Sequence, residues 1–349
     1  MAGPGTMQAI TISIGIKALN EERHIAQSLA SACAVAATVP GAIEVILADC
    51  GSRDRTVAIA REFDAVRIVQ LANFGERCCG AGAQAAFQTA TDRYFYLLDG
   101  DMELVPGFIA AGVAFLEANP EHAGVGGVVQ EANTGSIEFA ARARNDEVNG
   151  SAKTGDADRL DCGGLYRVSA IRDLGYFADR NLASFEEFDL AARLSAAGWK
   201  LARIAVPAVT HHGHDLPGLR LIWRRIRSGY AGGTGQIAVA AWGQPHMGLV
   251  LRRFSHLRHA LVVIGWWVLL TGALVGLLAT RNLGWGLALL VLIAAPIAFL
   301  SWRRGSLRFG TYSIATWMMH GIGLVQGLVQ RRVSPDRPLD LVILKDGQP

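Results

Sequence analysis

The chain has 349 residues, of which 51% are hydrophobic and 18% are charged, and its formal net charge is +3. This length excludes a single small module and accommodates one large domain with a further segment. In residues 1–215, 27 Asp and Glu oppose 18 Lys and Arg, a net charge of −9, whereas residues 216–335 contain 13 arginines and no acidic residue. The overall charge therefore averages an acidic soluble part and a basic membrane-facing part, and no nucleic-acid partner is expected.

Apolar runs typical of β-strands alternate with helical patterns in the first part of the chain. The strand-like runs are AITISIGI (9–16), IEVILADC (43–50), AVRIVQL (65–71) and RYFYLLD (93–99), and helical patterns cover 22–38, 54–64 and 80–91. This alternation is typical of a mainly parallel sheet covered by helices. We therefore predict an α/β fold for residues 1–215, with polar residues gathered where the strands end.

A glycine-rich stretch, GAGAQA (80–85), matches the G-x-G-x-x-A pattern of dinucleotide-binding proteins, and Asp99 follows at a suitable spacing. The stretch does not open the first βα unit, as the dinucleotide fingerprint does. A loop that leads into a helix of small residues explains the glycines more simply. A dinucleotide-dependent oxidoreductase is kept only as a minor alternative.

Two acidic residues, Asp99 and Asp101, follow the fourth predicted strand with one glycine between them. In open α/β sheets, ligands bind at the carboxyl ends of the strands. Two carboxylates this close raise each other's pKa, and a divalent cation such as Mg²⁺ or Mn²⁺ allows both to stay ionised. A surface turn is the competing interpretation, because Asp-Gly is common in turns.

The amino terminus lacks the charged start and apolar core of a secretory signal, so residues 1–215 are expected to be a cytoplasmic domain. The five cysteines all lie in this part and show no Cys-x-x-Cys spacing. Reduced thiols are therefore expected rather than disulfides or a zinc site.

Residues 216–256 are predicted to form an amphipathic linker at the membrane surface. Within it, residues 219–230 place one apolar face opposite a row of arginines, and that face comprises Leu219, Ile222, Trp223, Ile226 and Tyr230. A helix of this kind lies among lipid headgroups, and the lack of acidic residues favours anionic lipid as a partner. Packing of the helix on the soluble domain is the alternative.

Residues 257–332 are predicted to form a membrane region. Uncharged runs at 260–279 and 283–301 are each long enough to cross the hydrocarbon layer as a helix. Arginines flank both runs on one side, which the positive-inside rule assigns to the cytoplasm. A third uncharged run, 309–329, contains polar residues and is left as a span, a re-entrant segment or an interfacial segment. The side of the tail, 333–349, is left open.

Six stretches, in matching order, resemble family 2 glycosyltransferases of the GT-A fold. They are ISIGIKALNEE (12–22), EVILADCGSRDRT (44–56), LLDGDMELVPGF (97–108), CGGLYRVSAIRDLGYF (162–177), EEFDLAARLSAAGW (186–199) and VTHHGHD (209–215). The resemblance implies a GT-A domain with a mixed, mainly parallel sheet, and transfer of a sugar from a nucleotide diphosphate with inversion.

The resemblance also assigns a nucleoside site. Ala18 and Glu22 fall where the family lines this site, and Asp49 falls where an aspartate contacts the base. Many family members have two successive aspartates at that point, whereas this chain has Asp49 followed by Cys50. Contacts with the base can therefore differ, and uridine is the expected base.

Three residues are implied at the metal and the diphosphate. Asp99, Gly100 and Asp101 resemble the family's D-x-D motif, in which Asp99 approaches the ribose and the metal, and Asp101 holds the divalent cation. His211 resembles the histidine that completes the leaving-group site. Spacing alone does not distinguish it from its neighbours His212 and His214.

The EEFD segment resembles the acidic motif that carries the family's general base. Glu187 takes the position of the base, with Glu186 and Asp189 as alternatives. A carboxylate within hydrogen-bond reach of the attacking hydroxyl can accept its proton, and inversion needs no covalent intermediate. A charged helix start is the structural alternative, because carboxylates favour the positive end of a helix.

The expected function is transfer of a sugar from a nucleotide-diphosphate sugar to a hydroxyl of a lipid-linked saccharide. The setting is the inner membrane, in polysaccharide or surface-glycan biosynthesis, and the protein is expected to be multi-pass. A polyprenyl phosphate acceptor is one alternative, and a processive synthase is another, although its Q-x-x-R-W signature is absent. A membrane scaffold without activity is the alternative from a different class.

Overall fold

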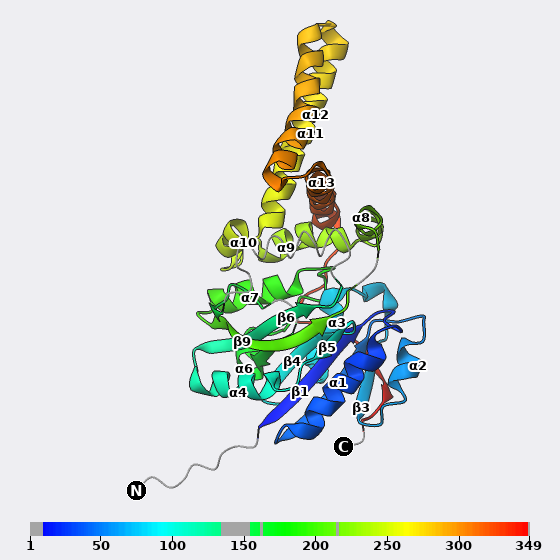
Figure 1. Cartoon of the computed structure of the whole chain (residues 1–349), viewed down its shortest axis with the longest axis vertical. Coiled ribbons are helices and arrows are strands. Elements are labelled where there is room, and N and C mark those ends of the chain that lie inside the picture. Colours follow the sequence, from blue (N-terminus) through cyan, green and yellow to red (C-terminus); the bar gives the residue numbers. More distant parts are fainter. Residues whose placement is uncertain (1–9, 134–153, 161–162, 214–215, 348–349) are drawn as a thin grey trace. The chain divides into compact units, whose positions relative to one another are not determined.

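The computed structural model describes residues 10–133, 154–160, 163–213 and 216–347 (Figure 1). The chain divides into two compact units. The first comprises Met1–Asn133, Gly150–His214 and Arg332–Pro349, and the second comprises Thr134–Asn149 and Asp215–Arg331. The first unit holds the predicted α/β region together with the last segment of the chain, and the second holds the long apolar helices.

The first unit is built on one mixed sheet (Figure 1). Strand β1 (Thr11–Ala18) lies parallel to its neighbours β2 (Ala42–Asp49) and β4 (Tyr94–Asp99), and β3 (Val66–Leu71) lies parallel to β2. Beyond β4 the order is β8 (Gly164–Arg167), β6 (His122–Glu131), β9 (Lys200–His211) and β5 (Met102–Leu104), while β7 (Gly155–Asp156) pairs with β9. The mixed sheet expected from the sequence is present, and its parallel part comprises β1 to β4 together with the pairing of β6 and β9.

Helices cover both faces of this sheet. Buried residues of α1 (Ile25–Thr38) and α4 (Phe108–Ala118) join one core cluster. Buried residues of α3 (Cys79–Thr89), α6 (Val168–Arg172) and α7 (Glu186–Ala196) join the other. The short helices α2 (Thr56–Ala60) and η1 (Phe74–Glu76) follow β2 and β3.

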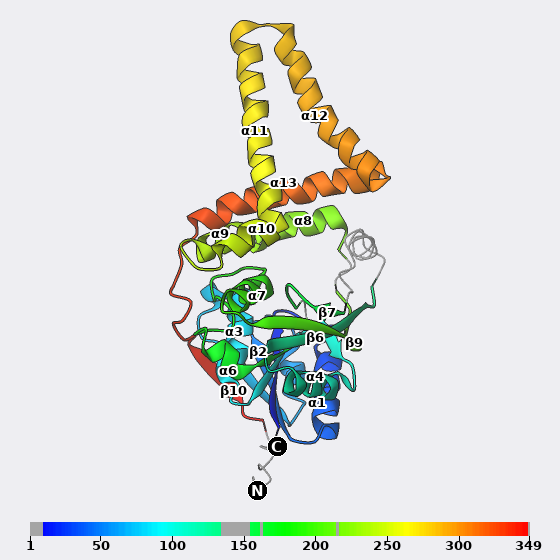
Figure 2. The same cartoon turned by 90° about the vertical axis from the view of Figure 1, so that its left-hand side faces the viewer.

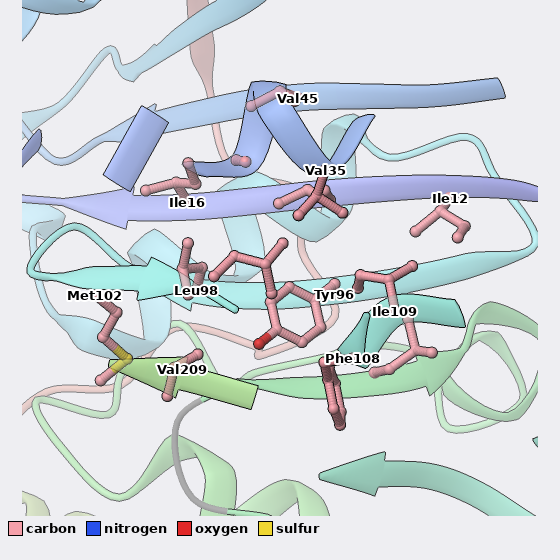
Figure 3. Packing of buried hydrophobic residues seen from close by; sticks show 14 of the residues in the cluster. Ile12, Ile16, Val35, Val45, Tyr96, Leu98, Met102, Phe108, Ile109 and Val209 are labelled. Atoms are coloured by element: carbon pink, nitrogen blue, oxygen red, sulfur yellow. The ribbon is translucent and has the colours of Figure 1, made fainter. Parts of the chain in front are cut away.

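Strand β4 illustrates why the sheet is apolar on both faces. Tyr96 and Leu98 point to the cluster formed with α1 and α4 (Figure 3), whereas Phe95 and Leu97 belong to the opposite cluster. All four are at most 4% exposed. Because both faces of the sheet are covered, the sequence of the strand is a continuous apolar run. Burial of each such side chain contributes roughly 1.5–3 kcal/mol to the free energy of folding.

The last segment of the chain completes the sheet. Strand β10 (Leu341–Lys345) pairs antiparallel with β3 at the sheet edge (Figure 2). Just before it, the backbone N and O of Leu339 bond to both amide atoms of Gln88, at 2.8 and 2.9 Å. Residues 341–345 of the segment predicted as a tail, 333–349, therefore form an edge strand of the first unit. Local sequence patterns could not show this, since 251 residues separate Gln88 from Leu339.

Among the described residues, the second unit contains two helices that are long and apolar enough to cross a membrane. These are α11 (Ser255–Thr280) and α12 (Leu283–Arg304), and most of their apolar side chains are exposed. Apolar helices with this exposure differ from the core helices of soluble proteins, which bury most of their surface.

The third apolar run forms helix α13 (Leu307–Val329), which lies across the directions of α11 and α12 in Figure 2. Glycines let it pack closely on η2 (Tyr230–Gly232) and α9 (Gly233–Ala241). A Cβ atom at Gly323 would lie 1.9 Å from the Ala231 oxygen, and one at Gly327 would lie 2.2 Å from the Gly232 oxygen. The small residues that make this run ambiguous in the sequence therefore serve packing within the unit.

The amphipathic helix α8 (Gly218–Arg227) buries only part of the apolar face that the sequence predicted. Ile222 is buried with Ala231 and Met319, as an apolar face requires. Leu219 and Trp223, expected on the same face, are 67% and 60% exposed. The helix therefore carries large apolar side chains that the unit itself does not cover. Helix α10 (Met247–Arg253) follows α9 in the same unit.

Candidate active site

The carboxyl ends of β1, β2 and β4 meet at one edge of the first unit's sheet. In the parallel register, Ala18 lies beside Asp49, and Lys17 lies beside Asp99. Helix α7 begins at the same edge, because the Lys17 ammonium group contacts Glu186 in its first turn. Acidic residues from two distant parts of the sequence are thus brought together.

Asp49 organises the loop that follows β2. Its carboxylate is buried and accepts hydrogen bonds from the backbone N of Gly51 (2.9 Å) and Ser52 (3.0 Å) and from Gln70 Nε2 (2.7 Å). Gly51 has a φ of +93°, which favours glycine. These bonds fix the loop, and contact of Asp49 with a nucleotide base stays a prediction.

The loop after β1 is tied to the same region. Ala18 is 5% exposed, and its carbonyl accepts a hydrogen bond from the Cys50 backbone N (2.9 Å). The exposed Glu22 accepts a hydrogen bond from the Arg55 backbone N and donates its own backbone N–H to Asp54, both at 3.1 Å. These bonds connect the segments that follow β1 and β2, which border the predicted nucleoside site.

Lys17 stands between three carboxylates. Its ammonium group donates a hydrogen bond to Glu186 and lies 3.1 Å from Asp99 Oδ1 and 3.4 Å from Glu187 Oε1. Burial raises the pKa of Asp99, opposed by Lys17 and reinforced by Asp101. Burial and the charge of Glu187 raise the pKa of Glu186, again opposed by Lys17. Burial lowers the pKa of Lys17, but the three carboxylates outweigh it and raise that pKa well above its usual value.

Asp101 faces a different cation. His211 Nε2 lies 3.4 Å from Asp101 Oδ2, and His211 Nδ1 lies 2.7 Å from Glu131 Oε2. Burial lowers the pKa of His211, but its hydrogen bonds to Asp101 and Glu131 prevail and raise the pKa to about 10. Of the two described histidines in the run, His211 is therefore the one beside Asp101, while His212 pairs with Glu103 at 2.6 Å. The position of His214 lies outside the described residues.

The three acids of the EEFD segment have different surroundings. Asp189 is 2% exposed and accepts a hydrogen bond from Arg193 Nε at 2.7 Å. Glu186 is 3% exposed and bonded to Lys17, whereas Glu187 is 19% exposed. Phe185, directly before them, has a φ of +69°, an uncommon conformation for a bulky residue that is often found at functional sites. Glu187 is thus the most accessible of the three.

The glycine-rich stretch that matched a dinucleotide fingerprint lies within α3. A Cβ atom at Gly80 would lie 2.1 Å from the Asp179 oxygen, and one at Gly82 would lie 2.8 Å from Cys50 Sγ. Close packing therefore accounts for these glycines without a bound pyrophosphate.

The donor atoms at this edge suit a divalent cation by their chemistry, since carboxylates and imidazole are common ligands. Within the part of the chain that the structure describes, however, no three such side chains converge as a metal site. Asp99 contacts Lys17, and Asp101 contacts His211. The ammonium group contacts Oδ1 of Asp99, so a cation would have to bind the other oxygen of this carboxylate, and it would have to take the place of a proton at His211. Metal binding by Asp99, Asp101 and His211 is therefore a proposal.

Two residues of this edge were missed by sequence reasoning. Lys17 is the one charged residue of β1, near the end of this strand, which could have marked it. Glu131 ends β6 and lies beside His211 through the parallel pairing of β6 and β9. The contacts of Lys17 with Glu186 and of Glu131 with His211 join segments that are far apart in the sequence, so local spacing could not show them.

Comparison with known proteins finds a family model that is similar to part of this chain. The family model "Glycosyl transferase family 2" matches residues 13–175. The chain is 33% identical over 117 residues to "Dodecaprenyl-phosphate galacturonate synthase" of Rhizobium johnstonii, covering 32% of this chain and 34% of that protein. The chain thus spans about a third of the length of this relative.

One solved structure is similar over most of the chain. It is the mannosyltransferase PcManGT from Pyrobaculum calidifontis in complex with GDP-Man and Mn²⁺, with a TM-score of 0.58 and 20% identity. The match covers 90% of this chain and 88% of that one. This likeness concerns the fold: the mixed α/β core is that of GT-A transferases, as the sequence predicted.

Proposed function

We propose that the protein is an inverting glycosyltransferase, because the glycosyl transferase family 2 model matches residues 13–175. Its donor is a nucleotide-diphosphate sugar, with UDP as the expected nucleotide. Its acceptor is a hydroxyl of a lipid-linked saccharide in polysaccharide or surface-glycan biosynthesis. The observation that supports the proposal most is the gathering of Asp99, Glu186 and Glu187 around Lys17 at the carboxyl edge of the sheet.

In this proposal the acids divide the reaction between them. Asp99 and Asp101 face the donor, and Asp101 with His211 would hold a divalent cation, which supplies positive charge beside the departing diphosphate. Glu187 accepts the proton of the acceptor hydroxyl. The hydroxyl oxygen bonds to the anomeric carbon from the face opposite the nucleotide, and the bond to the diphosphate breaks. Asp189, held by Arg193, serves the structure of α7.

A screen of nucleotide sugars tests the donor and the metal together. Thermal shifts of the full chain in detergent are measured with each nucleotide sugar, with and without Mn²⁺. We expect stabilisation by one UDP-sugar that depends on Mn²⁺ and is lost in Asp101→Ala. Asp173→Ala, which removes an exposed aspartate, is the matched control. Mn²⁺-dependent stabilisation that persists in Asp101→Ala would contradict the role of this residue.

A polyprenyl phosphate is the second candidate acceptor, because the similar protein from Rhizobium johnstonii is a dodecaprenyl-phosphate galacturonate synthase. A phosphate oxygen is already ionised and needs no general base, whereas a hydroxyl does. Glu187→Gln should therefore lower kcat at least about 100-fold with a hydroxyl acceptor and leave it nearly unchanged with a phosphate acceptor. Glu62→Gln, at an exposed glutamate, is the control.

We also propose that two crossings anchor a cytoplasmic first unit in the inner membrane. Helices α11 and α12 are the candidate spans. Strand β10 follows α13 in the chain and pairs with β3, so the segments before α8 and after α13 have to lie on one side of the membrane. An odd number of crossings would conflict with this pairing, so we propose that α13 lies in the interface. The arginines of 216–335, without any acidic residue, favour anionic lipid there.

Reporter fusions test this topology. A fluorescent protein fused after Pro349 should fluoresce in the cytoplasm, whereas alkaline phosphatase at the same position should be inactive. Alkaline phosphatase inserted at Asn282, between α11 and α12, should be active. Active phosphatase at the carboxyl terminus would refute the even number of crossings.

A further inference from the structure

A buried ammonium group joins the acid at the end of β4 to the acids at the start of α7. The Lys17 side chain is 11% exposed, and its ammonium group donates a hydrogen bond to Glu186. The same nitrogen lies 3.1 Å from Asp99 and 3.4 Å from Glu187. An ammonium group has three N–H donors, and here three carboxylates surround it.

This arrangement goes beyond charge balance within one ion pair. Glu186 is 3% exposed and suffices to neutralise one lysine. Lys17 nevertheless also contacts Asp99 and Glu187, which are more accessible at 27% and 19%. In the proposed reaction, Asp99 faces the donor and Glu187 is the base. The ammonium group therefore lies between the two groups that the reaction has to bring together.

The backbone of Lys17 lies where it can fix the distance between Asp99 and Glu187. Strand β1 pairs with β2 on one side and with β4 on the other, and Lys17 lies beside Ala48 and Asp99 in these registers. A side chain on a central strand holds its partners more accurately than one on a loop. By contrast, α7 begins after Phe185, at a left-handed backbone position outside the sheet. The contacts with Lys17 thus fix the positions of the Glu186 and Glu187 side chains relative to the sheet.

We propose that Lys17 is a positioning residue of the transfer reaction. It holds Glu187 at the acceptor side while keeping Asp99 at the donor side of one site, and Glu186 anchors its ammonium group. This inference rests on the proposed function, to which it adds a residue that touches neither substrate.

Two substitutions test this role in the full chain in detergent. Lys17→Met should lower kcat by at least about 100-fold, since a misplacement of about 1 Å can cost that much. The Kd for UDP in the presence of Mn²⁺, measured by calorimetry, should change less than about threefold, because the donor side keeps both aspartates. Lys17→Arg should recover part of the rate, since it keeps the charge in a different geometry. Lys200→Met, at an exposed lysine, is the control.

A double variant separates positioning from charge balance. Lys17→Met should also lower the melting temperature, because it removes the cation beside the buried Glu186 carboxylate. Adding Glu186→Gln removes this buried charge, so the melting temperature should recover while kcat stays low. Recovery of kcat together with the melting temperature, or a normal kcat in Lys17→Met, would overturn the proposal. Failure of the wild-type and Lys200→Met chains to bind UDP and to transfer sugar would refute the proposed function instead.

Discussion

The buried pair of Asp189 and Arg193 gives a prediction that separates structure from catalysis in the acidic motif. Arg193 is 7% exposed and donates to Asp189 Oδ2 (2.7 Å) and to the carbonyl oxygens of Tyr176 (2.9 Å) and Phe177 (2.6 Å). Its guanidinium group also lies 4.1 Å from the centre of the Tyr176 ring. Arg193→Met removes all of these contacts and leaves a buried carboxylate without its cation.

The expected cost follows from this geometry. Breaking a buried ion pair by removing one partner costs about 3–5 kcal/mol. Because α7 holds this pair, the free energy of opening α7 should fall by a similar amount. Hydrogen exchange of the α7 backbone amides, measured in the full chain, should then be faster by about 10² to 10⁴-fold. Arg193→Lys keeps a charge but loses the planar contacts, and it should show a smaller effect.

Substitution of the acid completes the test. Asp189→Asn keeps the shape of the side chain, so we expect a modest increase in exchange and retention of most transfer activity. Unchanged protection of α7 in Arg193→Met would refute the structural role that we assign to the pair. Loss of transfer in Asp189→Asn with full protection of α7 would mean that Asp189, and not Glu187, acts on the substrate.

Three further predictions concern stability. Without metal, the raised pKa of His211, about 10 against 6.5 for the free side chain, adds stability that is present below pH 6.5 and lost as the pH rises through 10. Melting temperatures over this range should therefore fall more in the wild type than in His211→Gln. Gly80→Ala places a Cβ 2.1 Å from the backbone oxygen of Asp179 and should lower the melting temperature, whereas Gly248→Ala, with its nearest atom at 4.0 Å, should not. Deleting residues 340–349 removes β10 and should lower the melting temperature and expose β3 to hydrogen exchange, which unchanged protection of that strand would contradict.

The parallel core of the fold could be predicted because each strand carries its own signal. The apolar run at 93–99 corresponds to β4, and the helical pattern at 80–91 corresponds to α3. The pattern at 54–64 forms a helix only over Thr56–Ala60, and a turn follows it directly. Boundaries are lost where the chain changes direction, since turns depend on the neighbouring elements as well as on local sequence.

Residues within one short motif of the site could be predicted from the sequence, whereas contacts between distant segments could not. Spacing places Asp99 and Asp101 at a strand end, and the structure puts Asp99 close enough to Asp101 for its pKa to respond. Arg193, the partner of Asp189, follows four residues later on the same helix, a spacing that permits such a pair. The contacts of Lys17 could not be found in this way, since its Glu186 partner lies 169 residues further along the chain.

The pairing of β10 with β3 also fixes an order of synthesis. The ribosome makes residues 341–345 after α11 and α12, so the edge of β3 stays uncovered until both of these apolar helices have been synthesised. A nascent chain that stalls within the second unit would carry an incomplete sheet with β3 open to other strands. Completion of the first unit is thereby linked to synthesis of the second, and fragments cut before α11 will lack the strand that covers β3.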